Sequence, residues 1–242
     1  MHAPDNFNHA SETPMAGRHS DTATFQGQIG RIRDIVEHAI EQPRGTTSLV
    51  ERLADRTSSL HASISLPADS APLLLADFVV RYIEHVPDFV EAIYEMAADS
   101  ELLPQVQPLL TIATDYFLKP PDLITEHSPL ESLLDEAYLA HRLLEEINDR
   151  FILRCGQPLV PMDTTRANLI AHELIGEPFA NELDQAVIFS AELLLSEYSF
   201  SGAVFDKFFA RHQQSGWSVE ISRWPCLASD RAIFLNFDRE RL

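Results

Sequence analysis

Carboxylate side chains gather over residues 122–136 of this 242-residue sequence, and a histidine follows them. Asp122 comes directly after two prolines, whereas Asp135 and Glu136 stand side by side after the next proline. Carboxylate oxygens are the ligands that hard divalent cations such as Mg²⁺ and Ca²⁺ prefer. Asp122, Asp135, Glu136 and His141 therefore form a candidate ligand or metal site. A divalent cation is the one cofactor that this pattern suggests.

The same acidic residues also have structural interpretations, which we favour. Asp122 can accept hydrogen bonds from the N–H groups of a turn. Ser128 and Glu131 have the spacing of a capping box, in which each side chain satisfies an N–H group at a helix N-terminus. At 100° per residue, Asp135 falls on the polar face of the following helix. On this interpretation the carboxylates cap and solvate the fold.

Two further polar residues lie on the apolar face of that helix. His141 and Asn148 are seven residues apart, which is close to two helical turns, and they share a face with Leu144. Polar groups that are buried between helices need hydrogen-bond partners. We predict that both side chains are buried and bond to neighbouring helices.

Catalytic signatures are missing from the sequence. His172-Glu173 begins like a zinc-protease motif, but Gly176 occupies the position of the second histidine. The chain has no G-x-S-x-G motif and no glycine-rich phosphate loop. Cys155 and Cys226 lie far apart and match no metal-ligand spacing, so both are expected to stay reduced. We therefore predict a noncatalytic protein.

The hydrophobic periodicity predicts helices along most of the chain. Pro43 and Gly45 end the first helix. Residues 71–97 form either one long helix or two short ones, and Pro87 is expected to cause a break near Val86. The expected helices cover about residues 24–42, 47–63, 71–97, 100–118, 129–153, 164–175, 178–198 and 202–212.

The two ends of the sequence differ from this helical middle. Residues 1–22 are polar and lack periodicity, which predicts a disordered tail. Apolar residues alternate with polar ones around Trp217 and again around Leu235, so residues 216–242 are expected to form either a small β-hairpin or an extended segment. The prediction is an all-α bundle of about seven to nine helices over residues 23–215, with this hairpin or extended segment packed on it.

One segment resembles a known family. From Pro120 the chain reads PPDLITEHSPLESLLDEAYLAHRLLEEIND, which is similar to the signature of the YkvA-like helical domain. Glu126 and Glu136 stand where that family usually has Asp, Thr125 replaces its second Pro, and Ser132 replaces its Gly. The matching residues are Pro120, Asp122, Leu123, Ile124, Pro129, Leu134 and Asp135. The resemblance covers about residues 72–150 and implies two helices joined by a tight acidic elbow, without implying an activity.

The net charge and the hydropathy of the chain exclude some classes of binding partner and of cellular location. The sequence has 37 acidic and 18 basic residues, for a net charge of −19, which disfavours binding to nucleic acid or to anionic membranes. No stretch has the length and apolar character of a membrane span, and the first residues do not resemble a signal peptide, so we expect a cytoplasmic protein.

Two functional hypotheses follow. The first is a noncatalytic helical protein that binds a partner protein or scaffolds an assembly, including one built from copies of itself. The alternative is a metal-dependent enzyme or ligand-binding bundle that uses the acidic elbow and His141.

Overall fold

The computed structural model confirms an all-α bundle. It describes residues 15–42, 44–67, 69–121, 129–197, 201–217 and 233–235, and within these it has eight helices and two short strands. The helices are α1 (Met15–Glu41), α2 (Gly45–Thr57), α3 (Ala71–Asp99), α4 (Leu103–Leu118), α5 (Pro129–Cys155), α6 (Thr165–Ile175), α7 (Phe179–Glu197) and α8 (Ala203–Ser215). The strands are β1 (Ile64–Ser65) and β2 (Phe234–Leu235).

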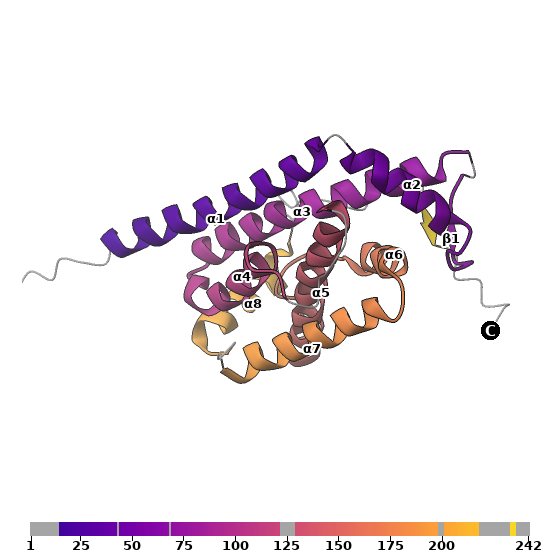
Figure 1. The fold of residues 1–242 in the computed structure, drawn as a ribbon. Helices are drawn as coiled ribbons and strands as arrows, with labels where there is room; N and C mark the ends of the chain where they lie inside the picture. The colour runs from indigo at the N-terminus through magenta and orange to yellow at the C-terminus, as the bar shows by residue number, and fades with distance from the viewer. Residues whose placement is uncertain are drawn as a thin grey trace, which may run out of the picture.

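Helices α3 and α5 form the centre of the bundle. Helix α1 runs along α3, and α7 lies below α5 on the opposite side of the molecule (Figure 1). Most residues of α5 from Leu130 to Leu144 are buried, because α3, α4, α6 and α7 surround it. A helix that is buried nearly all round belongs in a core. The contiguous apolar core extends from Phe25 in α1 to Ile233 beside β2.

The predicted break at Pro87 is wrong. Helix α3 continues without interruption from Ala71 to Asp99, and Pro87 lies inside it. Proline within a helix costs roughly 3 kcal/mol, because it lacks an N–H donor and crowds the preceding turn. Val86, Phe89 and Val90 are buried on either side of it, and such packing of a helix face supplies most helix stability in proteins. Packing therefore outweighs the local preference.

The two ends also differ from the prediction. Helix α1 begins at Met15, so residues 15–22 are helical rather than part of a tail, while residues 1–14 lie outside the described residues. Extending a helix that has already formed adds one backbone hydrogen bond per residue, which favours continued growth. No proline lies between Met15 and Gln42 to stop it.

Residues near Leu235 form a strand, as the alternation predicts, but the observed partner is distant in sequence. Strand β2 pairs antiparallel with β1, with Ile64 opposite Leu235 and Ser65 opposite Phe234. The other arm of the predicted hairpin, from Ser218 onward, lies outside the described residues. The pairing fixes this C-terminal segment beside the segment that follows α2.

The helices also bear on the question of a membrane span. Within the described ranges, none is both long enough and apolar enough to cross a bilayer.

Candidate functional site

Of the residues predicted to bind a metal, the structure describes Asp135, Glu136 and His141, and it places Asp135 and His141 on different sides of α5. Asp135, Glu136 and His141 are all buried in α5, and Asp122 lies outside the described residues. Asp135 lines a cavity of about 210 Å³ between α2, α5 and α6. His141 instead faces α3, because six residues along a helix correspond to a rotation of roughly 240°. Among the described residues, no group of three or more potential ligands could hold a metal ion.

The polar-face interpretation of Asp135 is wrong as well, since α2 and α6 cover that side of α5. The neighbouring Glu136 is also buried. Burial, with a smaller contribution from the charge of Asp135, raises the pKa of Glu136 to about 8. Removal from water disfavours the charged form of a carboxyl group, so this side chain is mostly protonated near neutral pH.

The two predicted buried polar residues are buried and hydrogen-bonded. His141 Nε2 lies 3.0 Å from the backbone oxygen of Tyr82, so Nε2 carries the proton and donates it. Its ring stacks on Tyr82 and on His85, with centroid distances of 4.1 and 5.3 Å. Burial, followed by the neighbouring His85, lowers the pKa of His141 well below its usual value. The imidazole is therefore neutral in the folded protein.

Asn148 connects α5 to the segment before α6. Its amide nitrogen donates to the backbone oxygen of Val160, and its side-chain oxygen accepts from the backbone N–H of Val160, both at 3.1 Å. The partner of Asn148 is thus a connecting segment, whereas the sequence predicted a neighbouring helix.

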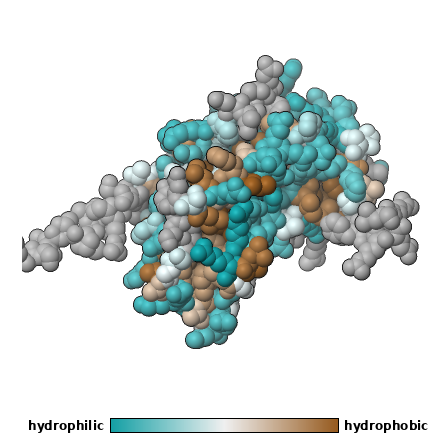
Figure 2. All heavy atoms as spheres, turned by 90° about the horizontal axis from the view of Figure 1, so that it is seen from below, coloured by the Kyte–Doolittle hydropathy of each residue, from teal (hydrophilic) through white to brown (hydrophobic). Residues whose placement is uncertain are grey.

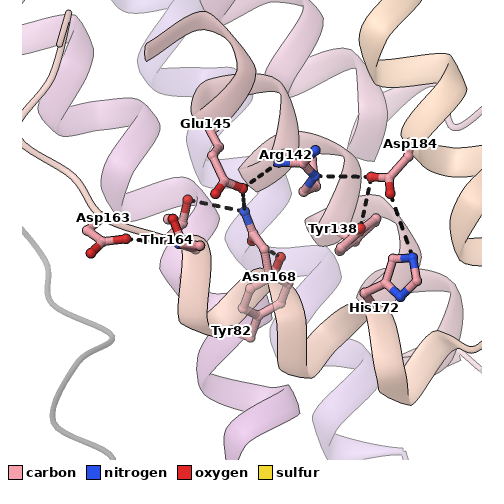
Figure 3. Close-up of polar contacts among 10 residues, drawn as sticks. Tyr82, Tyr138, Arg142, Glu145, Asp163, Thr164, Asn168, His172 and Asp184 are labelled. Atoms are coloured by element: carbon pink, nitrogen blue, oxygen red, sulfur yellow. Dashed lines mark hydrogen bonds and ion pairs between the residues drawn. The ribbon is translucent and has the colours of Figure 1, made fainter. Parts of the chain in front are cut away.

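An extensive polar network lies around a second cavity, between α5, α6 and α7 (Figure 3). This cavity has a volume of about 280 Å³ and opens to the surface. Helix α5 contributes Tyr138, Arg142 and Glu145, which fall on one face because they are four and three residues apart. The remaining polar lining comes from Thr165, Asn168 and His172 in α6 and from Asp184 in α7.

Arg142 lies between two carboxylates from different helices. Its Nε donates to Asp184 Oδ1 at 3.0 Å, and one terminal nitrogen donates to Glu145 Oε2 at 2.5 Å. Burial opposes the charge of Arg142, but the hydrogen bonds to Asp184 and the charge of Glu145 outweigh it, and the pKa is raised. Arg142 thereby joins α5 to α7 through a charge-assisted hydrogen bond.

Tyr138 and His172 complete the side of the cavity next to α7. The Tyr138 hydroxyl donates to Asp184 Oδ1 at 2.9 Å, and burial together with the charge of Asp184 raises its pKa, so it stays protonated. His172 Nε2 lies 3.2 Å from Asn181 Oδ1 and 3.7 Å from Asp184 Oδ2. The latter distance is longer than a hydrogen bond. Both described donors to Asp184 thus use the same oxygen, Oδ1.

Asn168 holds the inner side of the cavity. The hydroxyl of Tyr82 in α3 donates to its side-chain oxygen at 2.7 Å. Its amide nitrogen donates to Glu145 Oε2 and, at 3.2 Å, to Thr164 Oγ1. Tyr82 therefore links this network to His141, on which its ring stacks.

No family model, curated protein or solved structure matches this chain. The resemblance to the YkvA-like family stays a prediction that rests on the motif after Pro120. The function is therefore inferred from the geometry of the site.

The sequence pattern does not predict this cavity. It does not single out Arg142 or Asp184, and it relates His172 only to a zinc-protease motif that the chain lacks. The sequence does contain a signal for this site. The polar residues are three or four positions apart within each helix, so they share one face of α5 (Tyr138, Arg142 and Glu145) and one face of α6 (Asn168 and His172). Spacing alone, however, does not distinguish a polar face in water from one that another helix covers.

Proposed function

We propose that this chain is a noncatalytic helical protein that binds a partner protein, and that the cavity between α5, α6 and α7 receives a basic side chain of that partner. The main support for this proposal is that Glu145 and Asp184 lie on either side of Arg142 in an open cavity. Two carboxylates against one guanidinium leave the lining with an excess of negative charge. A group that donates hydrogen bonds and carries positive charge complements this lining.

The described contacts leave acceptor capacity on Asp184. Its Oδ1 accepts from both Tyr138 and Arg142, whereas Oδ2 lies beyond hydrogen-bond distance of His172. A carboxylate can accept about four hydrogen bonds in all. A planar guanidinium group could therefore bind at Oδ2 without displacing the internal network.

The size of the cavity favours a single side chain. Sites for drug-sized ligands enclose about 300–1,000 Å³, and this cavity of about 280 Å³ lies just below that range. The net charge of −19 adds a long-range attraction for a basic partner and repels a second copy of this chain.

The state of the lining supports binding rather than catalysis. The Tyr138 hydroxyl stays protonated and donates to Asp184, so it is a poor nucleophile. Arg142 and Glu145 are paired with each other. These side chains hold one another in place, and such fixed groups suit recognition of a partner.

The probe for this proposal is N-acetyl-arginine amide, titrated into isotope-labelled protein and followed by nuclear magnetic resonance. We expect saturable shifts at the amides of Asn168, His172 and Asp184, with a Kd of about a millimolar, as is reasonable for one side chain. The citrulline analogue, which has the same shape without the charge, should bind at least about tenfold more weakly.

The variant Asp184→Asn tests the site, and Asp77→Asn is its matched control. Both remove one negative charge, but Asp77 lies on the exposed face of α3, where it pairs with Arg81. Asp184→Asn should abolish the shifts, and Asp77→Asn should leave them unchanged. Equal effects of the two variants, or shifts spread over the whole acidic surface, would show nonspecific attraction and refute the proposal.

A further inference from the structure

We infer that the outer face of α7 docks a basic amphipathic helix of the partner. This inference rests on the proposed partner binding and specifies the element that the partner presents. The outer face is defined here by the exposed residues of α7 that follow Asn181, namely Glu182, Gln185, Phe189, Glu192, Leu193 and Ser196.

The spacing of this face suits helix-on-helix packing. Its members follow one another mostly at intervals of three and four residues, which forms a single stripe along α7. Phe189 at its centre is 69% exposed, and Leu193, one turn later, is 41% exposed. Seen from below, from the side on which α7 lies, the surface shows apolar patches between hydrophilic regions (Figure 2). Aromatic residues at the centre of a contact supply much of the energy of protein interfaces.

Charge identifies the occupant of this face. The outer face has two acidic residues, Glu182 and Glu192, and no lysine or arginine. The side chain of Glu192 is 63% exposed, and its ion-pair partner, Arg150, lies at 4.0 Å. An apolar centre with acidic neighbours is complementary to a helix that has leucines on one face and lysines or arginines beside them. A second copy of this chain would instead place like charges together.

The docking face and the cavity meet on the same helix. Asp184 reaches the cavity from α7, while the residues of the docking face point away from the core. A partner helix along α7 would therefore have basic residues near the cavity entrance. The two sites use different side chains, so each can be tested without the other.

The experiment uses a fluorescent peptide of leucine and lysine in an amphipathic helical pattern, with about the length of the 19-residue α7. Binding to the full chain is measured by fluorescence anisotropy at about 0.15 M salt, where distant charges are screened. We expect micromolar binding by the wild type. A peptide of the same composition in scrambled order, which cannot form an apolar face, should bind at least about tenfold more weakly.

The decisive variant is Phe189→Ser combined with Leu193→Ser. It should weaken binding of the amphipathic peptide about tenfold or more. Leu73→Ser is the matched control, because Leu73 is 62% exposed but lies on α3, so this change should leave the affinity unaltered. All three positions are exposed, and thermal melting should show that each variant folds.

The outcomes separate this inference from the proposed function. If the α7 variant binds the peptide like the wild type, or if Leu73→Ser weakens binding equally, docking on α7 is refuted. The α7 variant should still bind N-acetyl-arginine amide, and Asp184→Asn should not. Failure of the arginine probe to bind wild-type protein, with peptide binding intact, would instead refute the cavity proposal alone.

Discussion

At the scale of single residues, burial changes the charge of side chains that a sequence shows only as acidic or basic. Glu136 and His141 lie on the same helix and are both neutral in the core, one because it holds a proton and the other because it lacks one. Neither belongs to the cavity between α5, α6 and α7. Their shifted pKa values instead affect the stability of the protein and its dependence on pH.

Replacing Glu136 with Gln should stabilise the protein more strongly as the pH rises. The pKa of Glu136 is about 8 in the folded state and 4.5 for a glutamate in an unfolded chain, so between these values the folded state binds more protons. The contribution of Glu136 to wild-type stability therefore falls as the pH rises from 4.5 to 8, whereas glutamine does not titrate. We expect a gain of about 2–4 kcal/mol at about pH 8, at roughly 1.4 kcal/mol per pH unit after discounting for relaxation of the site.

Thermal or chemical unfolding of both proteins across that pH range measures this difference. The gain should shrink toward zero near pH 4.5, where Glu136 is largely protonated in the folded state and begins to be protonated in the unfolded chain. A difference that is the same at every pH would mean that Glu136 is not held protonated by burial.

At the scale of elements, helix ends depend on contacts from distant residues. Arg56 in α2 donates from Nη2 to the backbone oxygens of Glu173 and Leu174, at 2.8 and 3.0 Å, and so satisfies the C-terminus of α6. Gly176 follows with a φ of 86°, and a Cβ atom there would collide with the same guanidinium group. Gly176 and Arg56 therefore act together in ending α6.

A double-mutant cycle of Gly176→Ala and Arg56→Ala should reveal this coupling. Gly176→Ala alone should destabilise the protein by about 2–3 kcal/mol, because the positive φ strains an alanine and because Arg56 must move away from the backbone oxygens that it binds. In the Arg56→Ala background the collision disappears and only the backbone strain of about 1–2 kcal/mol remains. Urea unfolding of the four proteins gives the interaction energy, and strictly additive effects would show that the two residues do not act together.

At the scale of the whole molecule, the segment around β2 belongs to the same core as the helices. Ile233 is buried, and Leu235 packs against the core beside β1. One contiguous core predicts that the chain unfolds as a single cooperative unit. The net charge of −19 is likewise a property of the whole chain, and it sets the salt dependence of binding to any basic partner.

The substitution Ile233→Ala tests whether the C-terminal segment unfolds together with the helices. The substitution should destabilise the protein by about 2–4 kcal/mol, as is usual when a buried isoleucine is truncated, while keeping one calorimetric transition. Leu73→Ala, at an exposed position, is the control and should change stability by less than about 0.5 kcal/mol. A second transition, or no loss of stability, would show that the C-terminal segment is attached only loosely.

The sequence by itself determined the helical class, the order of the helices and several of their ends. Pro129 begins α5, and α6 ends directly before Gly176, as local turn chemistry predicts, whereas α8 continues to Ser215, beyond the predicted end at residue 212. These features depend on residues within a few positions of one another, so local periodicity and capping reveal them. The burial of His141 and Asn148 also followed from their place on an apolar stripe.

Only the tertiary structure decided which polar faces are covered. Arg142 and Asp135 occupy polar positions of α5 that look solvated in the sequence, but α7 lies over one and α2 with α6 over the other. The continuity of α3 through Pro87 and the pairing of β2 with β1 have the same origin. All depend on contacts between residues far apart in the chain, and neither hydrophobic period nor local propensity contains that information.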